Sequence, residues 1–247
     1  MAQNDQLDTV LQDSRLSNDD WQSLADVLKL DEFDITLPKN EKRELINREL
    51  RHSYGHTFKN IFRDEYEPDY DEIIRATAKK LKLSVRAHHT IDELEDKILI
   101  EVIDRIKETI IKKEGEAAWE KIEEDVNNDI IKQYDEGNLP PGFLDELKKY
   151  KGGVLVALLL AGKLSGIAVY LVANQLFFAI ARYLSLRIGV AVAGPIIGKS
   201  LAFLLGPAGW VFAALWLTYD IGNTNWKKVL PAAVIIIVLR KRFMYEV

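Results

Sequence analysis

The sequence predicts an all-α protein in which an acidic N-terminal helical domain precedes an apolar, basic C-terminal bundle or hairpin of helices. Helix caps and apolar residues at helical spacing recur through the first half, where no stretch alternates as a strand would. Residues 1–149 carry 36 acidic and 23 basic side chains, whereas residues 150–247 carry 2 acidic and 10 basic ones. Such a separation of charge is typical of two physical units. We therefore expect an acidic domain over 1–136, a linker with a short helix over 137–150, and an apolar domain over 151–247.

Two helix starts have clear capping signals. Ser17 precedes acidic residues and then apolar residues at helical spacing, so it is expected to cap a helix over residues 17–30. Thr90 and Glu93 form a capping-box pattern, in which each side chain can bind the other's free backbone N–H. The helix that Thr90 opens is expected to run to about Lys113. Further helices are expected over residues 41–53, ending near Gly55, over 69–81, over 116–135 as one or two helices, and over 143–150 after a turn-rich linker at 137–142.

The apolar half includes long runs without a charged side chain at residues 164–181, 200–219 and 229–239. A helix that is apolar on all sides is either buried in protein or immersed in lipid. About 20 such residues match the hydrocarbon thickness of a bilayer. Three interpretations remain open at this point: a buried core, a membrane hairpin formed by the first two runs, and a conditional or peripheral membrane element.

Basic residues flank these runs and bear on the orientation of a hairpin. Their positions favour both ends of the hairpin on the cytoplasmic side. Gly206 and Pro207 interrupt the second run, which suits short, broken helices packed on one another. The flanking residues are Lys148, Lys149 and Lys151 before the hairpin, and Lys227, Lys228, Arg240, Lys241 and Arg242 after it.

One segment resembles a phosphate-binding loop. Residues 193–200 read AGPIIGKS, with alanine in place of the first glycine of the usual pattern. Gly198, Lys199 and Ser200 would be the nucleotide-binding residues. A working loop needs a following helix and a later acidic strand, and the chain after Ser200 does not alternate between strand and helix patterns. A break in a helix is the favoured interpretation, and nucleotide binding is the alternative.

No other pattern predicts a catalytic, cofactor or metal site. His52 and His56 have the spacing of a metal-binding pair, but no third ligand is fixed near them, so capping or surface roles are favoured. Asp220 stands alone among basic and apolar residues and is expected to pair with Lys227, Lys228 or Arg240, or to cap a turn.

Composition narrows the classes of partner and compartment. The chain has no cysteine, so disulfides and thiolate metal sites are excluded and a reducing compartment is expected. A net charge of −5 argues against nucleic acid as the main partner. The polar, acidic N-terminus does not read as a signal peptide. We expect a cytoplasmic protein that associates with, or inserts into, the cytoplasmic membrane.

Several segments resemble one bacterial family. Residues 48–83 and the helix pattern at 90–110 are similar to the middle of the YaaW-type proteins. The motifs SGIAVYL, LGPAGW and DIGNTNWKKVLP, at residues 165–171, 205–210 and 220–231, are similar to the C-terminal region of the same group. Some members carry a label that relates them to the ubiquinol–cytochrome c chaperone. The resemblance implies an α-helical, non-catalytic protein near a membrane, and it transfers no catalytic residue.

The function predicted from these observations is that of a non-enzymatic helical protein with an assembly, chaperone-like or stress-related role. Its partners would be a protein and, through the basic flanks, anionic lipid, without a cofactor. The alternatives are the nucleotide-binding protein and a conditional membrane-inserting or pore-forming protein. The residues proposed for structural or interaction roles are Asp220, Trp210, Gly206, Pro207, Lys227, Lys228 and Pro231.

Overall fold

A computed structural model describes residues 5–58, 68–137, 155–187 and 226–245 of the chain. Within these ranges every regular element is a helix, so the predicted all-α class is confirmed for the described residues. The helices are α1 (Gln6–Gln12), α2 (Asn18–Leu28), α3 (Lys39–Phe58), α4 (Tyr70–Lys80), α5 (Ile91–Glu114), α6 (Glu116–Asp135), α8 (Leu155–Leu160), α9 (Ile167–Arg187) and α12 (Trp226–Tyr245).

The predicted caps form as expected. Ser17 caps α2, and its Oγ accepts a hydrogen bond from the N–H of Asp20 at 3.1 Å while its own N–H donates to the Asp20 carboxylate at 2.8 Å. Thr90 and Glu93 form the same reciprocal pair at the start of α5, at 3.2 and 2.9 Å. Because a capping box depends on residues three apart, the sequence alone is enough to predict it.

One helix differs from the expectation, and another decides between two alternatives. Helix α6 is a single helix, one of the two possibilities expected for its residues. Helix α3 does not end near Gly55 but continues to Phe58. A glycine inside a helix costs only about 1 kcal/mol relative to alanine. Tertiary packing of Ile46 and Leu50, both almost fully buried, outweighs this cost in α3. The linker and short helix expected over residues 137–150 lie almost wholly outside the described residues.

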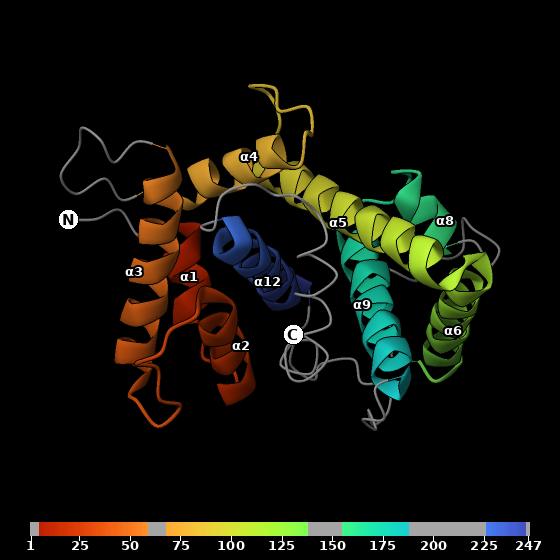
Figure 1. Ribbon diagram of the computed structural model, residues 1–247, viewed down its shortest axis with the longest axis horizontal. Helices are drawn as coiled ribbons and strands as arrows, with labels where there is room; N and C mark the ends of the chain where they lie inside the picture. The colour runs from red at the N-terminus through yellow and green to blue at the C-terminus, as the bar shows by residue number, and fades with distance from the viewer. Residues whose placement is uncertain (1–4, 59–67, 138–154, 188–225, 246–247) are drawn as a thin grey trace.

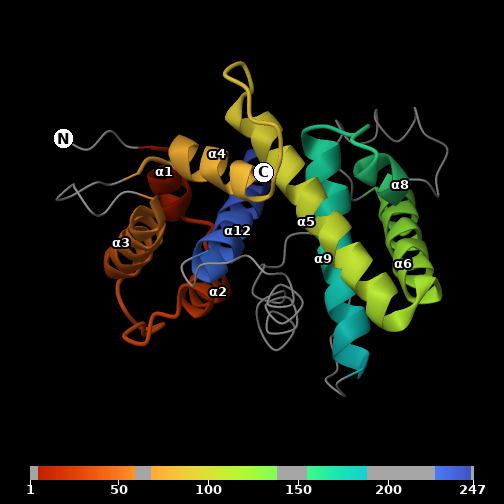
Figure 2. The same cartoon turned by 45° about the horizontal axis from the view of Figure 1, so that its top comes forward.

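The last helix lies in the middle of the molecule. Figures 1 and 2 both place α12 between α1–α4 on one side and α5 with α9 on the other. It contacts α1, α2, α3, α4, α5 and α9. Helix α5 runs along both groups, and α6, α8 and α9 pack together at its far end (Figure 1). The basic C-terminal helix therefore completes the core of the acidic N-terminal helices.

The first uncharged run, residues 164–181, is packed in protein. It forms most of α9, which contacts α5, α6, α8 and α12, and nearly all of its side chains from Ala168 to Ala181 are buried. The third run, residues 229–239, lies in α12 and is similarly buried. None of the helices in the described ranges combines the length and apolarity that a bilayer span requires. For these two runs the buried-core interpretation holds. The second run, residues 200–219, lies outside the described residues.

Candidate functional site

Charged residues meet in the interior at the C-terminal end of α12. Arg240, Lys241 and Arg242 follow one another on this helix, and each pairs with carboxylates from α2 or α5. Buried charges are rare in proteins unless they are paired, so this cluster is the strongest chemical feature of the described chain. We call it the α12 junction, and it consists of Asp20, Tyr70, Asp92, Glu95, Asp96, Arg240, Lys241 and Arg242.

Lys241 lies deepest in the α12 junction. Its side chain is only 1% exposed, and its Nζ lies 2.6 Å from Asp96 Oδ1 and 3.6 Å from Glu95 Oε2. Arg240 Nη1 lies 2.6 Å from Asp92 Oδ1 and 2.7 Å from Glu95 Oε2. Glu95 is thus shared between two cations, and it fastens α12 to the first turns of α5.

Arg242 joins α12 to α2. Its two terminal nitrogens donate to the two oxygens of Asp20, at 3.2 and 2.8 Å. A bidentate arginine–carboxylate pair fixes orientation as well as distance. Since Asp20 also closes the capping box with Ser17, one buried carboxylate both starts α2 and holds α12.

Glu95 is a buried carboxylate of the α12 junction whose pKa is shifted by its surroundings. Its side chain is fully buried, and the Tyr70 hydroxyl donates to its Oε1 at 2.7 Å. Burial raises the pKa of Glu95 above its ordinary value, although Arg240 and Lys241 act in the opposite direction. Burial and the nearby Glu95 also raise the pKa of Tyr70, so its hydroxyl stays protonated.

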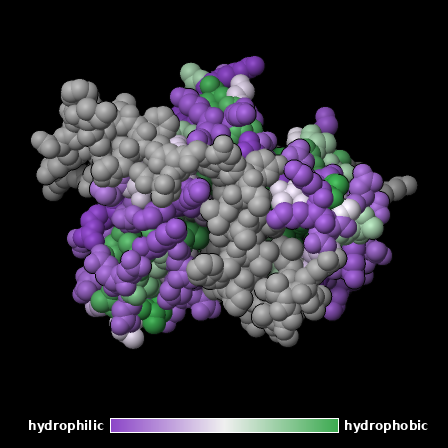
Figure 3. Space-filling model, in the orientation of Figure 1, coloured by the Kyte–Doolittle hydropathy of each residue, from purple (hydrophilic) through white to green (hydrophobic). Residues whose placement is uncertain are grey.

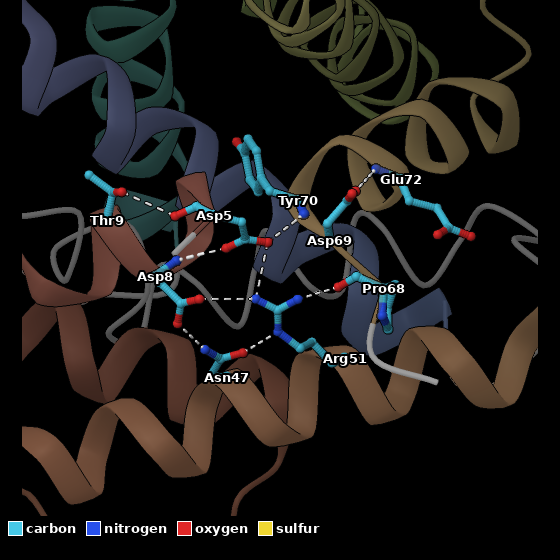
Figure 4. Close-up of polar contacts among 9 residues, drawn as sticks. All are labelled: Asp5, Asp8, Thr9, Asn47, Arg51, Pro68, Asp69, Tyr70 and Glu72. Carbon is cyan, nitrogen blue, oxygen red and sulfur yellow. Dashed lines mark hydrogen bonds and ion pairs between the residues drawn. The ribbon is translucent and has the colours of Figure 1, made fainter. Parts of the chain in front are cut away.

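Figure 4 shows a second cluster, which meets the α12 junction at Tyr70. Arg51 of α3 donates to Asp5 at 3.1 Å, to Asp8 at 3.5 Å, and to Asn47 and the Pro68 carbonyl. Asp5 also accepts the N–H of Tyr70 at 2.8 Å. Tyr70 therefore connects the two clusters, because its N–H binds Asp5 while its hydroxyl binds Glu95.

The basic residues 240–242 have a different role from the one expected. Under the hairpin interpretation they were the cytoplasmic flank of a membrane element, whereas they form ion pairs inside the protein. One signal in the sequence pointed to this outcome. Glu95 occupies a position on the apolar stripe of its helix, with Ile91 four residues before it and Leu99 four residues after it.

Of the residues proposed for interaction, those in α12 are described. Lys228 binds Glu49 of α3 at 2.8 Å, and Lys227 is exposed. Pro231 lies inside α12. The remaining ones, which are Asp220, Trp210, Gly206, Pro207, Gly198, Lys199 and Ser200, lie outside the described residues.

The structure describes the cations expected to pair with Asp220 and the side chain of one of the two histidines weighed as metal ligands. Lys228 and Arg240 both have carboxylate partners in the N-terminal half. His52 is exposed on α3. Across the described part of the chain no three histidine or acidic side chains are grouped as metal ligands would be.

Comparison with known proteins finds a protein of similar sequence. A UPF0174 protein of Helicobacter pylori (strain J99 / ATCC 700824) is similar to this chain. The two are 25% identical over 198 residues, which cover 80% of this chain and 70% of the relative. No protein-family model matches the chain, and no solved structure matches it either. The similarity supports a relationship to an uncharacterised bacterial protein. The YaaW-type resemblance and the chaperone label stay predictions.

The geometry of the α12 junction favours a structural use of its charges. Each cation faces at least one carboxylate at ion-pair distance, so these groups are engaged in holding α2, α5 and α12 together. Asp96 extends the network to the turn before α9, because its Oδ2 accepts the N–H of Gly166 at 3.0 Å.

This turn gives a testable prediction. Gly166 has φ +55°, and a Cβ built there would lie 3.3 Å from the hydroxyl oxygen of Tyr245. Gly162 also has a positive φ, +64°, but a Cβ there meets nothing within 4 Å. We expect Gly162→Ala to lower the free energy of unfolding by about 1–2 kcal/mol, the cost of a left-handed alanine. Gly166→Ala should cost roughly 1 kcal/mol more through crowding.

Denaturant unfolding of both variants measures this difference. Adding Tyr245→Phe to Gly166→Ala removes the crowding oxygen and should bring the loss close to that of Gly162→Ala. Equal losses for the two alanine variants would contradict the contact with Tyr245.

Proposed function

We propose that this chain is a non-enzymatic helical protein that acts by binding a protein partner at the cytoplasmic membrane. The observation that carries the non-enzymatic part is the α12 junction. Its buried titratable groups are bound to one another, in a way that supports a role in holding helices rather than in reacting with a substrate. The described helices would then form the body that a partner contacts.

The surface of this body suits an aqueous, polar contact. In the face shown in Figure 3, the described helices are mostly hydrophilic, with smaller hydrophobic areas among the charged side chains. Among the described residues, the large hydrophobic side chains with substantial exposure are Ile131, at 43%, and Met244, at 48%.

The membrane part of the proposal rests on the sequence of residues 200–219. The runs at residues 164–181 and 229–239 are packed inside the protein, and residues 200–219 form the longest uncharged run, which makes them the candidate for lipid contact. Its 20 residues without a charge match the hydrocarbon thickness of a bilayer.

Flotation of the full chain with vesicles tests the membrane part. We expect the protein to float with vesicles that contain anionic lipid. Trp210→Glu introduces a charge into the uncharged run, at a cost of about 3 kcal/mol in hydrocarbon, so the partition constant for vesicles should fall roughly 100-fold. Met244→Glu changes an exposed apolar residue of the helical body and is the matched control, which should float like the parent. A parent chain that stays unbound with every vesicle composition would remove the membrane from the proposal.

A further inference from the structure

The α12 junction holds more carboxylates than cations. Arg240 and Lys241 share Asp92, Glu95 and Asp96, which gives three carboxylates for two cations. Arg242 does not balance the surplus, because both oxygens of Asp20 already receive its donors. Arg240 and Lys241 each retain a second carboxylate at 2.6 Å when Glu95 is set aside.

The burial of the three carboxylates decides which of them is least stable as a negative charge. The side chain of Asp92 is 53% exposed, that of Asp96 is 14% exposed, and that of Glu95 is fully buried. Water stabilises the charge on Asp92, whereas the charge on Glu95 is stabilised only by the protein groups around it. The groups that stabilise it are Arg240 and Lys241 from α12 and the hydroxyl of Tyr70 from α4, whereas the acidic neighbours Asp92 and Asp96 on α5 oppose it.

The hydrogen bonds of Glu95 leave room for a proton. Its Oε2 faces Arg240 and Lys241 and remains an acceptor. Its Oε1 faces the Tyr70 hydroxyl, a group that can accept a hydrogen bond as well as donate one. A proton on Oε1 therefore keeps every heavy-atom contact of the carboxyl group in place.

We propose that Glu95 is a proton-binding site, which makes the docking of α12 on α5 depend on pH. The folded protein favours the protonated carboxyl more than the unfolded chain does, and loss of this proton as the pH rises leaves one uncompensated negative charge in the α12 junction. The docking of α12 weakens when that charge appears. This inference does not depend on the membrane proposal.

The direction of the effect follows from proton linkage. Burial raises the pKa of Glu95 in the folded protein above that of the unfolded chain. Between these two values the folded state binds more protons, so its stability falls as the pH rises. Glu93 lies two residues before Glu95 on the same helix and behaves in the opposite way. It is exposed, and its hydrogen bond from the N–H of Thr90 lowers its pKa, so its contribution to stability is lost as the pH falls.

Denaturant unfolding of the full chain from pH 4 to 8.5 tests the proposal with Glu95→Gln and the matched control Glu93→Gln. The ratio of the unfolding constant of the parent to that of Glu95→Gln should rise with pH, by at most about tenfold per pH unit, the limit for one proton. The same ratio for Glu93→Gln should fall as the pH rises. A ratio for Glu95→Gln that stays constant or falls would overturn the proposal.

A measurement on the parent protein covers the case in which Glu95→Gln does not fold. The carboxyl ¹³C resonance of Glu95, assigned through bonds, is followed as the pH changes. A midpoint above the ordinary glutamate value of about 4.3 supports the proposal, and a midpoint at or below that value overturns it.

Discussion

Trp226→Ala is expected to lower the free energy of unfolding by about 3–5 kcal/mol, the usual loss when a buried tryptophan is truncated. Trp226 begins α12 and is 2% exposed. Its ring and that of Tyr54 from α3 form a T-shaped pair with centroids 6.4 Å apart, and the Nζ of Lys80 from α4 lies 5.8 Å from its centre. Truncation therefore opens a cavity among the N-terminal helices, although Trp226 itself belongs to the C-terminal half.

Denaturant unfolding measures the loss, and hydrogen exchange locates it. Exchange should quicken in α3 and α4, which receive the indole ring. Met244→Ala truncates an exposed side chain near the other end of α12 and should change the free energy of unfolding by less than about 0.5 kcal/mol. If Trp226→Ala loosened only α9 and left α3 and α4 protected, the central position of α12 would be wrong.

Asp20→Asn should cost about 3–5 kcal/mol, because it leaves the buried Arg242 without its carboxylate. The asparagine retains one acceptor oxygen, so α2 can keep a cap. Most of the loss in the free energy of unfolding then comes from the buried guanidinium of Arg242, which has no carboxylate partner. Removing both charges in Asp20→Asn with Arg242→Met should recover a large part of the stability, since no unpaired buried charge remains.

The neighbouring Asp19 offers a matched control for this pair. It also lies in the first turn of α2 but is exposed, so Asp19→Asn should cost less than about 1 kcal/mol. Thermal unfolding of the parent, Asp20→Asn, Arg242→Met and the double variant gives the coupling between Asp20 and Arg242 as a double-mutant cycle. A double variant less stable than the sum of the two single losses would contradict the assignment.

Local signals explain which parts of the fold could be predicted from the sequence. Ser17 and Thr90 cap helices through residues three positions away, so their roles follow from short patterns. Gly55 shows the limit of such patterns, because burial of the residues before it carries α3 onward to Phe58.

The α12 junction could not be predicted in the same way. Lys241 and Asp96 are far apart in the sequence, and a helix as apolar as α12 does not indicate which neighbours surround it. The opposite charges of the two halves were visible, but they were interpreted as a division of the chain. In the structure these charges pair with each other, as Lys228 does with Glu49 and Arg182 with Asp129.

The position of α12 also has a consequence for biosynthesis. Helices α1–α4 leave the ribosome early, yet the helix that fills the space between them is translated last. At about 5–20 residues per second, the stretch from residue 81 to 225 takes roughly 7–30 s to translate. During that interval the nascent N-terminal segment exposes the apolar faces that α12 later covers. Its protection from aggregation in the cell therefore depends on chaperones that bind nascent chains.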